Sequence, residues 1–180
     1  NSYKIDYFTT LIKSVVLISA FLVMLCSLNY VKQNDILKIE YPILILSSIL
    51  GMLVMVSSND LIVFYVGLEL QSLALYVLAA FKRDNILSSE SGLKYFILSA
   101  LSSGLLLYGC SLIYGFSSST NFDLIYQNSG SIEYGIIFGI VFILVGLAFK
   151  ITAVPFHMWA PDVYDGSPTS VTVIFAILPK

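Results

Sequence analysis

GIIFGIVFILVGLAFKITAVPFHMW, at residues 135–159, carries the strongest structural signal in the chain. It begins as an apolar run of the length that a membrane-spanning helix needs, roughly 20 residues. Lys150 lies near the end of this run, and Pro155 follows. A proline lacks the N–H that continues a helix, and its ring clashes with the preceding turn. We therefore predict a helix broken near Pro155, as membrane proteins tolerate where backbone lines a cavity or a protein interior.

The composition of the whole chain is that of a membrane protein. Of its 180 residues, 58% are hydrophobic and 11% are charged, whereas a soluble domain carries about 25% charged residues. The net charge is −2 and no basic patch is present, which argues against nucleic acid as a partner. Cys26 and Cys110 lie inside apolar stretches, where cysteine behaves as a small core residue and not as half of a disulfide or metal pair.

The chain contains five apolar runs of about spanning length and one shorter run at its end. This pattern predicts an all-α polytopic membrane protein, with residues 1–180 forming a single membrane domain. Ser167 and Pro168 suit the cap and first turn of the last helix. At about 1.5 Å per residue, that helix crosses only about two-thirds of the hydrocarbon core, so we expect its remainder in another segment or chain. The expected helices cover residues 8–28, 42–57, 61–81, 92–115, 135–154 and 168–180.

The loops predict an orientation and the small residues predict helix contacts. Basic residues follow the first and third predicted helices, whereas the loop 116–134 carries neither Lys nor Arg. The excess of positive charge in inner loops then places the N-terminus outside. Small residues four apart predict close helix packing, at Gly135 with Gly139 and at Ala100 with Gly104.

Five charged side chains lie within the predicted helices. We interpret Lys13 as interfacial, and the other four are the candidate functional residues: Glu69, Lys94, Lys150 and Lys180. A charge near the bilayer centre costs several kcal/mol, so its presence there indicates a function, and the two signs allow pairing. The single histidine, His157, follows the predicted break and is of a residue type that relays protons near neutral pH. No Gly-rich nucleotide loop, CxxC pair or His pair occurs. The sequence therefore predicts a chain that handles protons and not electrons.

Each candidate also has a structural interpretation. Lys94 and Lys150 lie near predicted helix ends, from which a lysine can extend its amine to the membrane surface. His157 can hydrogen-bond a carbonyl freed at the break. Glu69 can be a protonated or paired structural carboxyl, but Tyr65, Ser72 and Tyr76 are expected on the same helix face and form a polar stripe with it. We favour function for Glu69 and Lys150, and leave Lys94 and His157 open on position alone.

Three blocks of the sequence closely resemble a known family. They are NDLIVFYVGLELQSLALYVLAAFKR at 59–83, SGLKYFILSALSSGLLLYG at 91–109 and ITAVPFHMWAPDVYDGSPTSVT at 151–172. They are similar to NADH dehydrogenase subunit 2, an antiporter-like, proton-pumping membrane subunit of respiratory complex I. The resemblance implies that this chain carries most of the first half of an antiporter-like fold and none of the second. Asp165 and Ser170 stand where the family pattern has Glu and Pro.

The resemblance also implies roles for the candidate residues. Glu69 would be the acid of a Glu–Lys pair and Lys150 its partner, with Lys94 modulating the pair. Lys180 would pass protons on toward the missing half, and His157 resembles a histidine near the break. The chain itself would bind no cofactor, because NADH, FMN, iron–sulfur clusters and ubiquinone belong to other subunits of the complex. It would be a non-redox subunit of a proton-translocating NADH:ubiquinone reductase.

The implied partners are other membrane-arm subunits, a chain or segment supplying the second half, and membrane lipids, without nucleic acid. The residue usage favours the mitochondrial inner membrane, with a bacterial plasma membrane or a plastid thylakoid as alternatives. Two other functions stay open. One is a cation/proton antiporter subunit of the multisubunit sodium type, and the other is a purely structural membrane subunit. The 151–172 block favours the complex I subunit over both.

Overall fold

Polar side chains mark the starts of the long helices in the computed structural model, which describes residues 2–34, 36, 38–128 and 134–179. Thr9 accepts a hydrogen bond from the Asp6 backbone N–H at 2.8 Å as the first helix begins. Asp60 and Asn85 cap the third and fourth helices by accepting from backbone N–H groups in the first turn. The helices are α1 Tyr7–Gln33, α2 Glu40–Val56, α3 Leu61–Ala79, α4 Ile86–Ser117, α5 Phe122–Asn128, α6 Tyr134–Lys150, α7 Ala160–Gly166 and α8 Thr169–Ile177.

The all-α class predicted from the sequence is confirmed, since the described ranges contain helices, connecting segments and isolated bridges but no strand. Helices α1, α3 and α4 are long and apolar enough to cross a membrane, and α2 and α6 are shorter apolar helices. Helix α4 begins earlier than residue 92, because Asn85 caps it at Ile86. The polar connector 116–134 contains a short helix, α5, which the sequence analysis did not anticipate.

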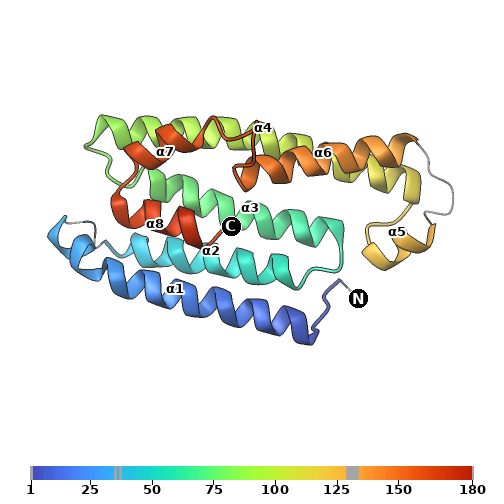
Figure 1. The fold of residues 1–180 in the computed structure, drawn as a ribbon, viewed down its shortest axis with the longest axis horizontal. Helices are drawn as coiled ribbons and strands as arrows, with labels where there is room; N and C mark the ends of the chain where they lie inside the picture. Colours follow the sequence, from blue (N-terminus) through green and yellow to red (C-terminus); the bar gives the residue numbers. More distant parts are fainter. Residues whose placement is uncertain (1, 35, 37, 129–133, 180) are drawn as a thin grey trace.

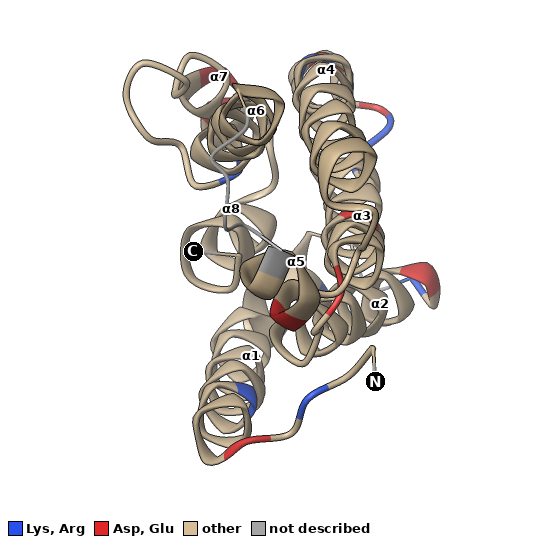
Figure 2. Cartoon of the chain, turned by 90° about the vertical axis from the view of Figure 1, so that its right-hand side faces the viewer, with Lys and Arg blue, Asp and Glu red and all other residues tan. Residues whose placement is uncertain are grey.

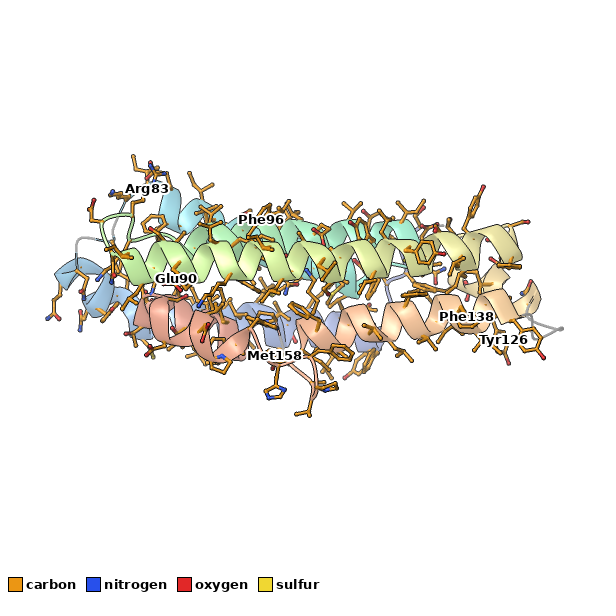
Figure 3. The ribbon with its side chains drawn as sticks, turned by 90° about the horizontal axis from the view of Figure 1, so that it is seen from above. Arg83, Glu90, Phe96, Tyr126, Phe138 and Met158 are labelled. Carbon is orange, nitrogen blue, oxygen red and sulfur yellow. The ribbon has the colours of Figure 1, made fainter. Side chains whose placement is uncertain are left out.

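The break near Pro155 is confirmed and lies nearer Lys150 than the expected helix end at residue 154. Helix α6 ends at Lys150, turns occupy the segment up to Trp159, and α7 then begins. Figure 3 shows α7 beside the first half of α4 and α6 beside its second half, with Met158 at the gap between them. The two pieces therefore run along α4 in the manner of one interrupted helix. Helix α8 ends at Ile177, and Lys180 lies outside the described residues.

Glycines bring the two most extensive helix pairs, α2 with α3 and α4 with α6, into backbone contact. A Cβ added to Gly51 of α2 would lie 2.5 Å from the backbone N of Gln71 in α3. A Cβ on Gly109 of α4 would lie 2.7 Å from the carbonyl O of Gly139 in α6. Such approaches are how membrane helices gain packing energy. Gly139 thus makes the predicted contact, whereas Gly104 meets nothing within 4 Å among the described residues.

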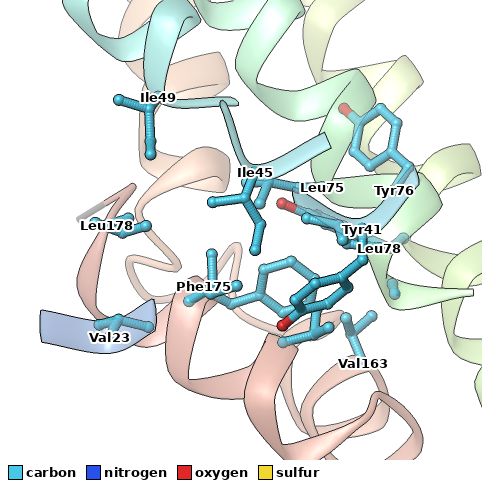
Figure 4. Packing of buried hydrophobic residues seen from close by; sticks show 14 of the residues in the cluster. Val23, Tyr41, Ile45, Ile49, Leu75, Tyr76, Leu78, Val163, Phe175 and Leu178 are labelled. Carbon is cyan, nitrogen blue, oxygen red and sulfur yellow. The ribbon is translucent and has the colours of Figure 1, made fainter. Parts of the chain in front are cut away.

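A buried apolar cluster joins α1, α2, α3, α7 and α8. Figure 4 shows Ile45, Leu75, Leu78 and Phe175 converging from α2, α3 and α8. A second cluster, which includes Leu68 and Leu106, fills the space between α3, α4 and α6. Because α8 folds back onto α1, α2 and α3, the segment after the break closes over the first helices (Figure 1).

Polar contacts gather the loops at two ends of the bundle. At one end the Lys82 amine donates to Asn34 Oδ1 at 3.0 Å, which joins the loops after α1 and α3. At the other end Thr120 donates to Asp60, and Asn59 donates to Asp123. Figure 2 views this second end and shows charged residues at only a few positions on the ribbon. The long helices therefore run between two polar ends with an apolar body between them.

Candidate functional site

The last turn of α6 brings a lysine against the helix that carries the intramembrane carboxylate. Lys150 Nζ lies 3.6 Å from Glu69 Oε1, and 12% and 23% of the two side chains are exposed. Lys150 is the final residue of α6, and Glu69 lies about 12 Å along α3 from its start, at about 1.5 Å per residue. The predicted opposite charges thus meet in the interior, where pairing offsets part of the cost of burying them.

Two further polar groups complete the environment of this pair. Ser103 of α4 donates a hydrogen bond to Glu69 Oε1, the same oxygen that faces the lysine. The Lys150 amine donates to the Tyr76 hydroxyl at 3.2 Å and lies 5.8 Å from the centre of that ring. The site therefore draws on three helices, with α3 supplying the carboxylate and the tyrosine, α4 the serine and α6 the lysine.

Two of the side chains expected on the same face of α3 as Glu69 make hydrogen bonds of different kinds. Tyr76 binds the lysine and not the carboxylate. The Ser72 hydroxyl donates to the backbone carbonyl of Glu69 at 3.2 Å, because a serine at i+3 of a helix reaches that carbonyl readily. The serine that donates a hydrogen bond to the Glu69 carboxylate is Ser103 of α4. Sequence reasoning missed Ser103, although the closely spaced serines 99, 102 and 103 in an apolar helix indicate a buried polar face.

Aromatic rings connect the ion pair with the segment after the break. Tyr76 packs edge-to-face on Tyr95, with ring centroids 4.7 Å apart, and Tyr95 stacks on Trp159 at 4.5 Å. Trp159 Nε1 donates to the carbonyl O of Phe149 at 3.1 Å. That carbonyl also accepts a hydrogen bond from the Thr152 backbone N–H at 3.2 Å, so the tryptophan adds a side-chain contact to the helix end immediately before Lys150.

Lys94 lies in a separate cluster from the Glu69–Lys150 pair. Its amine is 2.7 Å from Asp162 of α7 and 2.8 Å from Glu90 of its own helix, and 44% of its side chain is exposed. Asp162 had not been singled out from the sequence, because it and Lys94 are far apart in the chain. The structure therefore gives Lys94 carboxylate partners other than Glu69.

The remaining candidates stand apart from the pair. His157 is exposed on the segment between α6 and α7, because the chain leaves the helix there and carries the side chain away from the interior. Lys180 lies outside the described residues, so its predicted role stays a prediction. Over the part of the chain that the structure describes, no group of three His, Cys, Asp or Glu side chains is placed to hold a metal ion.

Fold and site together define a class of membrane protein, in which apolar helices enclose a lysine–carboxylate pair beside a broken helix. The family described as NADH:quinone oxidoreductase/Mrp antiporter, TM, matches residues 58–180. This chain belongs to that family. The resemblance seen in the sequence to an antiporter-like subunit of complex I is thereby confirmed.

Individual relatives agree with this assignment. The chain is 67% identical over 180 residues to NADH-quinone oxidoreductase subunit N of Pelagibacter ubique, a match that covers 100% of this chain and 38% of the relative. It superposes on a chain of respiratory complex I from Thermus thermophilus with bound aureothin, with a TM-score of 0.82, 31% identity and coverage of 100% and 39%. A chain of the Mrp complex from Dietzia shares the fold, with a TM-score of 0.77, 24% identity and coverage of 97% and 32%.

These comparisons bear on length and on location. The chain spans about two-fifths of the length of the relatives it matches. The relatives named subunit N come from bacteria, among them Pelagibacter ubique and Rhodospirillum rubrum. This origin supports the bacterial plasma membrane, the alternative raised from the sequence, and gives no support to the mitochondrial inner membrane.

Proposed function

We propose that this chain contributes part of a proton-translocating membrane-arm subunit of an NADH:quinone oxidoreductase. The observation that carries the proposal is the Glu69–Lys150 pair, 3.6 Å apart and largely buried at the end of the broken helix. The relatives named NADH-quinone oxidoreductase subunit N support the choice of complex. The chain takes no part in electron transfer, and NADH, FMN, iron–sulfur clusters and quinone are bound by other subunits.

The pair acts as a switch for one proton. A charged carboxylate close to a lysine favours the protonated amine, whereas separation of the two in a low-dielectric interior favours the neutral amine. Quinone reduction elsewhere in the complex alters the field around Glu69, and the change in the pair releases a proton from Lys150. Tyr76, at 3.2 Å from the amine, is the hydroxyl through which the lysine contacts the rest of α3. Lys180 and the second half of the subunit receive the proton.

The partners follow from the length and the surface of the chain. The remaining three-fifths of the subunit completes the proton path, in a further segment or a separate chain. Neighbouring membrane-arm subunits and lipids cover the exposed apolar residues of the long helices. The membrane is the bacterial plasma membrane, in keeping with the bacterial relatives.

Substitution of the carboxylate tests the proposal directly. In a bacterial complex that carries the full-length subunit, Glu69→Gln keeps the shape of the side chain and removes the charge that favours the protonated lysine. We expect the number of protons translocated per NADH oxidised to fall by about half or more, measured in inverted membrane vesicles. Glu40→Gln, at the exposed start of α2, is the matched control and should leave the ratio unchanged. A wild-type ratio in Glu69→Gln would rule out the pair as a working element.

A second experiment separates the complex I assignment from the two alternatives. Detergent-solubilised membranes are run on a native gel, stained for NADH dehydrogenase activity, and peptides from the active band are sequenced. Peptides of this chain in the active band support the assignment. Their absence from an otherwise complete band favours a sodium-type antiporter, for which sodium-dependent proton transport is the next assay. A structural subunit would be found in the band, yet would show no pumping defect in Glu69→Gln.

A further inference from the structure

Lys94 joins α4 to α7, the short helix that follows the break. Its amine lies 2.7 Å from Asp162 Oδ2 in α7, and 2.8 Å from Glu90 one turn earlier in α4. A charge-assisted contact of this length fixes both position and orientation. The lysine therefore ties the first half of α4 to the short helix that follows the break.

The surroundings of the Lys94 amine keep it charged. A small cavity of about 140 Å³ between α4 and α7 is lined by Lys94 together with Glu90, Asp162 and Asp165. Two of these carboxylates, Glu90 and Asp162, lie within ion-pair distance of the amine, and opposite charges at such range favour the protonated form of a lysine. An amine held in this way serves poorly as a carrier that must release its proton.

Helix α7 is attached to α4 at two further points on either side of the ion pair. Trp159, at its start, stacks on Tyr95, with ring centroids 4.5 Å apart. Gly166, at its end, lies so close to α4 that an added Cβ would be 2.6 Å from the carbonyl O of Leu87. Asp162 lies between these two contacts, so the ion pair holds the centre of the short helix.

The start of α7 in turn closes the end of α6. Trp159 Nε1 donates to the Phe149 carbonyl, directly before Lys150, at 3.1 Å. Tyr95 also packs on Tyr76, whose hydroxyl accepts a hydrogen bond from the Lys150 amine. A displacement of α7 would therefore reach Lys150 by two routes, through the helix end and through the tyrosine.

We propose that Lys94 is a positioning residue, which holds α7 through Asp162 and thereby keeps Lys150 in place against Glu69 without exchanging a proton itself. This inference rests on the proposed function of the Glu69–Lys150 pair and gives a physical route for the modulating role that the resemblance implies for Lys94. Lys94 acts as a permanent charge, and the geometry of α7 carries its effect to the pair.

Arginine provides the sharpest test, because its guanidinium forms the same ion pairs and does not lose its proton in proteins. We would make Lys94→Arg, Lys94→Met and Asp162→Asn in the full-length subunit of the assembled complex. Lys82→Met is the matched control, since Lys82 lies at the same end of the bundle and contacts Asn34 instead of α7. The readouts are protons translocated per NADH oxidised and the rate of backbone hydrogen exchange in residues 159–167.

Lys94→Arg should keep most of the wild-type pumping ratio and the protection of α7. Lys94→Met and Asp162→Asn should each lower the ratio and raise exchange in residues 159–167 several-fold. The double variant Lys94→Met/Asp162→Asn should be no worse than the more severe single variant, because both single variants remove the Lys94–Asp162 contact. Lys82→Met should change neither readout.

Two results would overturn the inference. One is a pumping loss in Lys94→Arg as large as in Lys94→Met, with α7 still protected from exchange, which would make Lys94 a proton carrier. The other is unchanged exchange in α7 for both Lys94→Met and Asp162→Asn. Asp162→Asn preserves the side-chain shape, so it tests the contact even where a lysine variant fails to assemble. The exchange measurement also stands if Glu69→Gln leaves pumping intact, so the two proposals fail separately.

Discussion

The Glu69 carboxylate is stabilised by groups from helices other than its own. Ser103 of α4 donates a hydrogen bond to its Oε1 atom, and Lys150 of α6 forms an ion pair with the same atom. Burying a carboxylate removes its hydrogen bonds to water, which destabilises the folded protein unless protein groups replace them. One partner replaces only part of that hydration. The serine therefore gives the Glu69 carboxylate a second partner besides the lysine.

Removal of the serine hydroxyl should weaken this site without disturbing the fold. Ser103→Ala deletes one hydrogen bond to a charged group, which is worth about 1.5–3 kcal/mol. We expect a lower proton-to-electron ratio than in wild type, smaller in effect than that of Glu69→Gln, measured in the same vesicles. Ser111→Ala is the control, because the Ser111 hydroxyl donates to Tyr108 of its own helix. Equal ratios for both serine variants would remove Ser103 from the site.

Helix α4 is the element that organises the site. It pairs with α6 along its second half and with α7 along its first half (Figure 3), and its Ser103 donates to Glu69. The pairing with α6 depends on glycines, because Gly109 and Gly139 allow the two backbones to approach. The position of Lys150 at the end of α6 depends on this approach.

A methyl group in that contact should separate the two helices. Gly109→Ala places a Cβ about 2.7 Å from the Gly139 carbonyl, and overpacking of this kind costs about 1–3 kcal/mol. We expect a lower melting temperature of the detergent-solubilised complex and less assembled complex on a native gel. A Cβ at Gly104, in the same helix, would meet nothing within 4 Å in the described part of the chain, so Gly104→Ala should be neutral or stabilising, since alanine favours the helix. Equal melting temperatures for Gly109→Ala and Gly104→Ala would show that the close contact between α4 and α6 does not stabilise the complex.

The molecule as a whole presents apolar helices between two polar ends. Helix α1 is exposed along much of its length, with Val15, Ile18, Phe21 and Leu25 among its exposed side chains. Lipid or other protein must cover such a surface in the membrane. The hydrogen bond from Lys82 to Asn34 gathers the loops after α1 and α3 at one end. The distribution of Lys and Arg predicts that this basic end faces the cytoplasm.

Thiol labelling tests this orientation. Cysteines introduced one at a time, as Asp84→Cys and Tyr126→Cys, occupy exposed positions at opposite ends of the bundle. The background carries Cys26→Ser and keeps Cys110, which is buried. A membrane-impermeant reagent should label position 126 in spheroplasts and position 84 only in inverted vesicles. Labelling of both positions from the same side would contradict the alternation of the helices, and the reverse pattern would invert the orientation.

Much of the fold was accessible from local features of the sequence. Apolar runs predicted the long helices, and Lys150 followed by Pro155 predicted where one of them ends. The short helix α5 was missed because its polar, serine-rich flanks resemble a loop. The contact at Gly139 was foreseen and the contact at Gly104 was not formed, because spacing alone does not tell which face of a helix meets a neighbour.

The sequence alone established the membrane class, the break and the ionisable residues, because these depend on apolar length, proline geometry and the cost of burying a charge, all of which act within one segment. The partners of those residues required the folded chain. Ser103 reaches Glu69, and Asp162 reaches Lys94, across helices that are distant in sequence. Such contacts arise from the way α4 packs against α3, α6 and α7, and a packing angle is a property of two surfaces that neither helix encodes separately.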